Sequence, residues 1–267
     1  GAVLLAVPVA SARNGFYYAG AVDLLSGKQG LANVKAMANL DATRLRLAET
    51  SREYLAGLAL PDDWTEWIKL NGGEMDVLPW EITYCPANDL PWRPSPTIQT
   101  YVAYTAFLDQ RLSNHFATRE WAPRFLLIEW TGFDDRLLPY DVPVTWRTLL
   151  KHYELAAKEP ERELLLLVRR PVPVDFAPTE SEEAALVLDE WIDVPSADGM
   201  LLAAPNLQLT REGHLMKTAL RIPPVYAEFE FADGQTRKVR LMPESSARGI
   251  VVNRPPLEWF DAVRAFS

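Results

Sequence analysis

Cysteine and histidine are scarce in this sequence. The chain of 267 residues has a single cysteine, Cys85, and only three histidines, which lie far apart. A lone thiol excludes an internal disulfide, a zinc centre of several thiolates and a CxxC redox pair. The histidines form no HxH or HExxH spacing, so we expect no metal ion and no other cofactor. Next to a proline, Cys85 is most simply interpreted as a small buried hydrophobic residue.

Basic residues and long apolar runs are also few. Lys and Arg number 27 against 36 Asp and Glu, which gives a formal net charge of −9. This balance argues against a nucleic-acid partner and disfavours docking onto anionic lipid headgroups. No run of 18 apolar residues occurs, so we expect no segment of this sequence to span a bilayer. A nucleotide fingerprint (G-x-G-x-x-G or P-loop) and a G-x-S-x-G nucleophile motif are both absent.

The N-terminal segment is apolar. After Gly1 the sequence reads AVLLAVPVASA and ends in small residues. This pattern resembles the tail of a membrane helix or a signal-peptide core with an A-x-A-like end. It also fits a buried strand with Pro8 at its limit, which is the interpretation we favour. The two interpretations are compatible if the natural chain continues upstream into a membrane.

The pattern of apolar residues predicts alternating helices and strands over the first two thirds of the chain. Helical spacing over residues 31–58 places Leu31, Val34, Ala38, Leu45, Tyr54 and Leu58 on an inward face. Further helices are predicted after Asp63, after Thr105 and from Pro143, and strands over residues 75–79, 97–102, 125–130, 153–157 and 163–169. This alternation predicts an α/β fold: a Rossmann-like three-layer unit with a mainly parallel sheet.

The pattern changes after about residue 172. Residues 173–183 are rich in proline and acidic residues and are interpreted as a linker between an α/β domain (1–172) and a β domain (184–267). Short alternating runs in the last part predict a small antiparallel, β-sandwich-like domain. For the hairpin over residues 227–241, a two-residue Asp233-Gly234 loop would mix the two faces of the strands. A loop one residue longer pairs residues of the same face and of opposite charge. That register sets Phe229 opposite Val239, Glu230 opposite Lys238 and Glu228 opposite Arg240.

Polar and aromatic residues are densest after the predicted strand at 75–79. The predicted ligand-binding residues here are Asp76, Trp80, Glu81, Asn88, Trp92, Arg93, Gln99, Tyr101 and Tyr104. The aromatic rings can stack on a sugar, and the arginine and amides can bond its hydroxyls or a phosphate. Side chains near the carboxyl ends of strands lie where open α/β sheets bind ligands. In the alternative interpretation these rings pack the proline-rich loop and Arg93 pairs with Asp76 or Glu81.

A second polar cluster follows the predicted strand FLLIEW. It holds Glu129, Asp134 and Asp135, which are candidates for acid/base catalysis or for binding a divalent cation, and Arg136 as a further ligand-binding candidate. Consecutive side chains normally face opposite ways, and Arg136 offers an internal partner. A structural loop closed by an Asp–Arg pair is therefore the simpler interpretation.

The segment 76–116 resembles a recurrent segment in the extracytoplasmic part of large bacterial multi-pass membrane proteins of unknown function. The matching elements are DVLPWE (76–81), Asn88, WRP (92–94) and the stretch from Gln99 to Asp109. DDR (134–136) resembles a D-x-R element and GIVVN (249–253) a G-I-x-x-N element, so the likeness covers about residues 75–255. Ser95 stands where the pattern has an arginine and Thr100 where it has a serine, and the first departure weakens the case for an anion-binding arginine pair.

The resemblance implies membrane attachment through an upstream segment and display on the periplasmic or exterior side of the cell membrane. Our leading hypothesis is an accessory or binding domain that contacts envelope glycans or lipid-linked sugars. One alternative, drawn by analogy, is the catalytic part of an envelope glycosyltransferase, with Asp134 or Glu129 as base and Arg93 on a phosphate. Another is a protein–protein interaction module that uses open edges of the β domain.

Overall fold

The first compact unit comprises residues 1–57 and the second residues 58–267. The computed structural model describes residues 28–176, 185, 189–208, 213 and 224–267. The apolar N-terminal segment therefore lies outside the described residues. In the first unit, α3 (Lys28–Ala38) is followed by α4 (Leu40–Gly57), and α4 has no buried residue. The inward face predicted from the spacing is not observed, because Leu31, Leu45 and Tyr54 are 59%, 68% and 51% exposed.

The second unit is built on a sheet of four strands. Its strands are β1 (Met75–Leu78), β2 (Phe125–Glu129), β3 (Tyr153–Glu159) and β4 (Leu164–Arg169), in the order β1-β2-β4-β3. Only β1 and β2 are parallel; β4 is antiparallel to both of its neighbours. The sheet is therefore mixed, and the prediction of a mainly parallel sheet is wrong. The short turn between β3 and β4 leaves no room for the crossover that a parallel pair needs.

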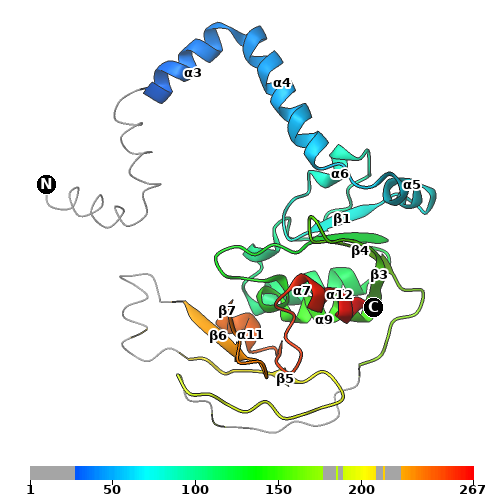
Figure 1. Cartoon of the computed structure of the whole chain (residues 1–267). Coiled ribbons are helices and arrows are strands. Elements are labelled where there is room, and N and C mark those ends of the chain that lie inside the picture. The colour runs from blue at the N-terminus through cyan, green and yellow to red at the C-terminus, as the bar shows by residue number, and fades with distance from the viewer. Residues whose placement is uncertain (1–27, 177–184, 186–188, 209–212, 214–223) are drawn as a thin grey trace, which may run out of the picture. The chain divides into compact units, whose positions relative to one another are not determined.

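Both faces of this sheet are covered by helices. On one face, side chains such as Leu126 and Leu167 pack with α7 (Ala106–Ala117), α9 (Pro143–His152) and α12 (Trp259–Phe266). On the other face, Leu127 and Leu166 pack with α5 (Asp62–Leu70) and α6 (Tyr84–Ala87). Figure 1 shows α7, α9 and α12 together on one side of the strands. A strand buried on both faces needs apolar residues at every position, which explains the runs FLLI and LLLL.

Local signals placed most elements of this unit correctly. The hydroxyl of Thr105 accepts a hydrogen bond from the backbone N–H of Leu108 and so caps α7 as predicted. Residues 97–102 do not form the predicted strand but end in a 3-10 helix, η1 (Thr100–Val102). The backbone N–H of Thr100 donates to the carbonyl of Pro79 at 2.9 Å, and Ala103 donates back to Thr100. These bonds close a turn instead of a ladder.

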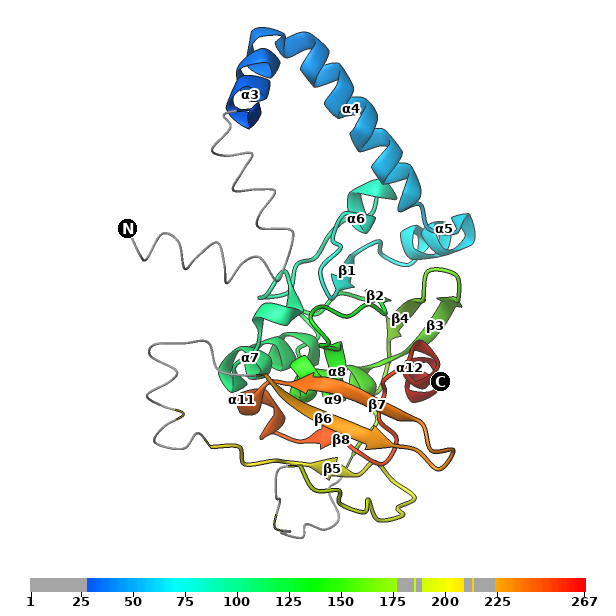
Figure 2. The ribbon, with the colours of Figure 1, turned by 60° about the vertical axis from the view of Figure 1, so that its left-hand side comes forward.

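Two small antiparallel sheets follow, β5 (Leu202–Ala203) with β8 (Ile250–Val251) and β6 (Val225–Glu230) with β7 (Thr236–Leu241). Val239 and Ile250 from these sheets share a core with Tyr140 of α8 (Leu138–Asp141). Figure 2 shows β6 and β7 beside α11 (Pro243–Ser246). The chain then returns to the larger sheet, where Phe266 of α12 packs on Trp146 with ring centroids 5.0 Å apart. Residues 177–183 of the predicted linker lie outside the described residues, and the domain boundaries stay a prediction.

The register of the β6–β7 hairpin differs from the prediction by two residues. Ala227 lies opposite Val239, and Glu228 lies opposite Lys238. The loop is one residue longer than a two-residue turn, as expected, but its last residue is Gly234, whose φ is +77°. Gly234 donates to the carbonyl of Phe231, and Phe231 donates to that of Gln235. This is a turn closed by a left-handed glycine, so the place of that glycine decides the register. A shift of two residues keeps the same side chains on the inner face.

Candidate functional site

The carboxyl ends of the parallel strands β1 and β2 lie at the same edge of the sheet. The loop after β1 brings Trp80 and Glu81 to this edge, and β2 ends there in Glu129. The bond from Thr100 to Pro79 adds the segment around Tyr101. Side chains from three separate stretches of sequence therefore converge where open α/β sheets bind ligands.

Three aromatic side chains form what we call the aromatic rim: Trp80, Tyr101 and Phe133. Tyr101 stacks on Phe133 with centroids 5.2 Å apart and meets Trp80 edge-on at 5.7 Å. The hydroxyl of Tyr101 donates to the side-chain carbonyl of Gln99 at 2.6 Å. Phe133 is 54% exposed, and Trp80 and Tyr101 are half-buried. The rim thus presents ring surface to solvent and a polar amide beside it.

Two carboxylates, Glu81 and Glu129, interact at the same edge. Burial raises the pKa of Glu129, the negative charge of Glu81 raises it further, and Arg162 opposes both effects. Arg162 itself is held by Glu159, to which its Nη2 donates at 2.6 Å. Burial and then Glu129 raise the pKa of Tyr84 to about 12. Two like charges that share a site push one carboxyl toward its protonated form, which is the arrangement used in acid/base chemistry.

Asp76 and Trp92 face into the protein and not toward the edge. The carboxylate of Asp76 accepts hydrogen bonds from Nε1 of Trp92 at 2.8 Å and from the backbone N–H of Ser95 at 3.1 Å. Asp76 is 2% exposed, and burial raises its pKa to about 6. Cys85 is buried close by, as the sequence predicted, and burial followed by the charge of Asp76 raises the pKa of its thiol to about 12. These groups tie the proline-rich loop to β1.

The side chains of Asn88 and Arg93 also form hydrogen bonds and ion pairs with other residues of the protein. The side chain of Asn88 accepts from the backbone N–H of Leu60 and donates to the carbonyls of Leu58 and Tyr84. Arg93 pairs with Glu74 and donates to the carbonyls of Glu120 and Trp121. The partner expected for Arg93 in the packing interpretation was Asp76 or Glu81, so that pairing is wrong. Ion pairing with Glu74 places Arg93 on the side of the sheet where β1 and β2 begin.

Asp134 and Asp135 form the tip of a tight turn. Phe133 and Arg136 exchange both backbone hydrogen bonds across it, and the two aspartates have φ of 58° and 60°. Aspartate tolerates this left-handed conformation better than most residues, which is a physical reason for the Asp-Asp pair. Asp134 forms an ion pair with Arg240 of β7, and the carbonyl of Asp135 accepts from the backbone N–H of Arg240. The tip therefore docks onto the β6–β7 hairpin.

Arg136 supports the aromatic rim from behind. Its Nε donates to the carboxylate of Asp141 at 2.7 Å, and its Nη2 donates to the backbone carbonyl of Tyr101 at 2.6 Å. The expected Asp–Arg closure of this loop exists, but the partner is Asp141, whose pKa burial raises to about 6. Tyr104, 53% exposed, has no hydrogen bond within the described part of the chain.

The predicted residues thus divide into two groups. The first group meets at one edge of the sheet, with Arg136 bonded to the backbone of Tyr101, and consists of Trp80, Glu81, Gln99, Tyr101 and Glu129. The second group bonds to other parts of the protein and consists of Asp76, Asn88, Trp92, Arg93, Asp134 and Asp135. Sequence reasoning missed Phe133, Tyr84 and Arg162. Phe133 was adjacent to a noted cluster, but nothing in the local sequence connects Arg162 with Glu129.

The G-I-x-x-N element noted in the sequence is structural here. Gly249 has φ of +98°, and its carbonyl accepts from Arg147. The side chain of Asn253 accepts from the backbone N–H of Leu201 at 2.8 Å and donates to the carbonyl of Gly199 at 2.8 Å. Both residues hold the β5–β8 pair in place.

Comparison with known proteins found no match: no family model, curated protein or solved structure matches this chain. Among the residues that the structure describes, no group of three or more His, Cys, Asp or Glu side chains is arranged to hold a metal ion. In the same residues, no helix combines the length and apolar character needed to cross a bilayer.

Proposed function

We propose that this chain is an extracytoplasmic accessory or binding domain of a multi-pass bacterial membrane protein, facing the periplasm or exterior. In this proposal its aromatic rim contacts an envelope glycan or a lipid-linked sugar. The observation that supports the glycan contact most directly is the stacked Tyr101–Phe133 pair beside the half-buried Trp80. The membrane attachment and the location rest on the resemblance of segment 76–116.

The chemistry of the edge suits a sugar. Flat ring faces pack against the C–H faces of a pyranose, and carboxylates accept hydrogen bonds from its hydroxyls. Glu81 and Glu129 lie at the same edge as the rim, and Gln99 adds an amide. The helices on both faces of the sheet also support a distant relation to Rossmann-like three-layer units, with an antiparallel β4 inserted next to β2.

Retention of the 267-residue chain on immobilised glycans tests this proposal. Trp80→Ala and Tyr101→Ala should each weaken retention about tenfold, because each removes ring surface worth roughly 1–3 kcal/mol of apolar contact. Trp121→Ala is the matched control: Trp121 is 56% exposed and lies just before β2, at the opposite edge of the sheet. If the rim variants keep the retention of the unmodified chain on every glycan, the contact is not at the rim.

A second candidate function is glycosyl transfer with Glu129 as the base. The raised pKa of Glu129 beside Glu81 favours it, since a base or acid works best with a pKa moved toward the working pH. Asp134 is less suited because it is paired with Arg240. Transfer from a polyprenyl-phosphate sugar should then be abolished in Glu129→Gln and retained in Glu120→Gln, a change at an exposed residue outside this site. Absence of transfer by the unmodified full-length protein would remove this candidate.

A further inference from the structure

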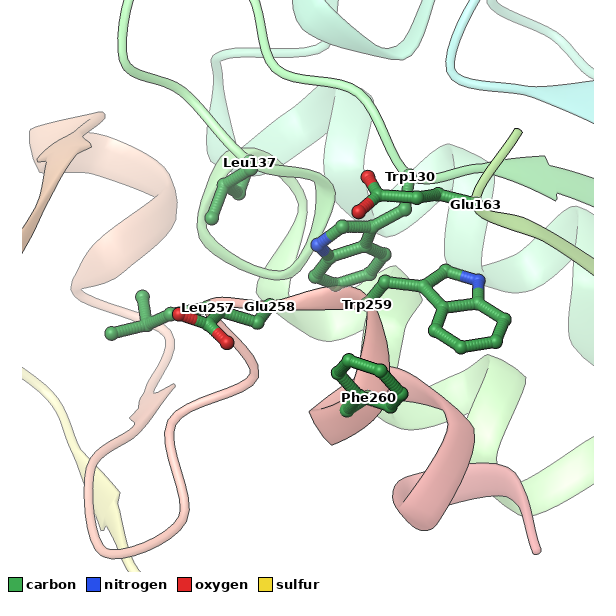
Figure 3. Close-up of a pocket in the computed structure, with 7 residues that line it drawn as sticks. All are labelled: Trp130, Leu137, Glu163, Leu257, Glu258, Trp259 and Phe260. Atoms are coloured by element: carbon green, nitrogen blue, oxygen red, sulfur yellow. The ribbon is translucent and has the colours of Figure 1, made fainter. Parts of the chain in front are cut away.

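A pocket opens at the same end of the sheet, on the face opposite the Glu81–Glu129 pair. It has a volume of about 350 Å³ and is lined by Trp130, Glu163, Trp259 and Phe260, together with Glu258 and two leucines. Trp130 directly follows Glu129 at the end of β2, so the side chains of these two residues lie on opposite faces of the sheet. Figure 3 shows side chains from just after the end of β2 and just before the start of β4 together with those at the start of α12.

Trp130 contributes a buried donor to this pocket. The residue is 8% exposed, and its Nε1 has no hydrogen-bond partner within the part of the chain that the structure describes. Figure 3 shows this nitrogen directed toward the space between Leu137 and Leu257, whereas the nitrogen of Trp259 is directed the opposite way. A buried N–H without an acceptor is destabilising, so native proteins rarely leave one without a role.

Glu163 contributes an unpaired carboxylate. Its backbone carbonyl accepts from the N–H of Trp130 at 3.0 Å, and its φ is +52°. Among the described residues its carboxylate has no hydrogen bond or ion pair, and in Figure 3 it lies beside the ring of Trp130. Glu258 differs, because it pairs with Arg237 at 3.2 Å and caps α12. Within the described part of the chain, the pocket is therefore lined by one donor and one carboxylate without partners, on two residues whose backbones are hydrogen-bonded to each other.

A hydroxyl group satisfies both. It accepts one hydrogen bond and donates another, whereas an ammonium group has no acceptor for the indole N–H. An anionic ligand would be repelled by the negative charge of Glu163. Apart from Glu258, the remaining lining side chains are apolar or aromatic, and Phe260 is 63% exposed. A ring with hydroxyls on its edge and C–H groups on its faces matches this surface.

We propose that this pocket binds one neutral sugar ring, with a hydroxyl that accepts from Nε1 of Trp130 and donates to the carboxylate of Glu163. The class of ligand rests on the proposed carbohydrate function, and the contacts rest on the residues of the pocket. The inference adds a second sugar-binding position to the one at the aromatic rim.

Indole NMR of the whole chain tests the proposal. The chain has 9 tryptophans, so ¹⁵N labelling reports each Nε1–H separately, and the Trp130 signal is identified by its loss in Trp130→Phe. Glucose, galactose, mannose and N-acetylglucosamine are added one at a time. We expect at least one of them to shift the Trp130 signal in a saturable manner.

Three variants check the contacts, with sugar affinity measured by isothermal titration calorimetry because Trp130→Phe lacks the Trp130 signal. Trp130→Phe and Glu163→Asn should each weaken binding of that sugar about tenfold, because each removes one partner of the bridging hydroxyl. Asparagine accepts the left-handed backbone at position 163 but is shorter and uncharged. Trp121→Phe is the control, because Trp121 is 56% exposed and does not line the pocket, and affinity should stay within about twofold.

The outcomes separate the two sites. If sugars shift the Trp80 signal but never that of Trp130, the pocket proposal is wrong and the rim proposal stands. If the Trp130 signal responds while the rim variants keep full glycan retention, the pocket proposal stands and the rim proposal falls. A response of Trp130 to choline or to a proline-rich peptide, with none to sugars, would overturn the pocket proposal in favour of a cation or peptide site.

Discussion

The carboxylate of Asp109 on α7 accepts a hydrogen bond from the backbone N–H of Thr145 at 2.9 Å and another from its hydroxyl at 2.8 Å. It also accepts from the backbone N–H of Val144 at 3.0 Å. α9 begins with Pro143, which has no N–H, so these are the first free donors of the helix. A side chain of α7 therefore caps α9, and it does so while fully buried.

Replacing Asp109 should destabilise the second unit. Asp109→Ala leaves the buried backbone donor of Thr145 and the part-buried one of Val144 without acceptors, and we expect it to lower the free energy of unfolding by about 3 kcal/mol. Asp109→Asn keeps one acceptor and should cost about half as much. Urea unfolding measures both. Thr145→Val is the control, because it keeps the backbone donors and should cost about 1 kcal/mol. A loss in Asp109→Ala no larger than in the control would mean that the cap contributes little.

Asp76 should make stability depend on pH. Its pKa is raised to about 6 from 3.8, chiefly by burial, so the folded protein binds this proton more tightly than the unfolded chain does. The stabilisation from protonation is present at low pH and is lost as pH rises from about 4 to about 6, a change of about 3 kcal/mol at most. Denaturant unfolding at pH 4, 5, 6 and 7 should show this loss.

Asp76→Asn isolates that effect from the other carboxyls. The amide does not titrate, so the difference in unfolding free energy should move in favour of the variant between pH 4 and pH 7, by up to about 3 kcal/mol. A difference that stays constant over this range would show that Asp76 keeps an ordinary pKa in the folded state.

The pKa of Glu129 should respond to its two charged neighbours in opposite directions. Glu81→Gln removes a negative charge and should lower the pKa of Glu129. Arg162→Gln removes a positive charge and should raise it. Titration of the side-chain carboxyl by ¹³C NMR measures both shifts, and Glu120→Gln, an exposed residue outside this group, should leave the pKa unchanged. Shifts of the same sign in the two variants would contradict the arrangement.

Gly249 should not tolerate a side chain. Its φ of +98° is unfavourable for other residues, and an added Cβ would lie 3.3 Å from Nη1 of Arg147. We expect Gly249→Ala to lower the free energy of unfolding by about 2 kcal/mol. Gly199→Ala is the control, because a Cβ there has nothing within 4 Å, and it should change stability by less than about 0.5 kcal/mol. Equal thermal unfolding of the two variants would argue against the strained backbone at Gly249.

Only part of the candidate site was predictable from the sequence. Trp80, Tyr101 and Glu129 were recognised from their types and from their place near the carboxyl ends of predicted strands. The parallel β1–β2 pair brings the ends of two of those strands to one edge, whereas the strand predicted around Tyr101 is not formed. The roles of Arg93 and Asp134 were not predictable, since their partners Glu74 and Arg240 are chosen by contacts between distant elements. Trp130 looked like the last residue of a buried strand, and only α12 makes it part of a pocket.

The sequence alone determined the elements whose causes lie within a few residues. Thr105 caps α7, the run LLLL makes a strand buried on both faces, and Gly72 and Gly73, both with positive φ, end α5. Tertiary structure decided the mixed strand order, the ion pairs and the buried caps such as Asp109. The reason is physical: backbone propensity and apolar periodicity act locally, whereas a buried polar group takes whichever partner the packing of distant elements brings within hydrogen-bond reach.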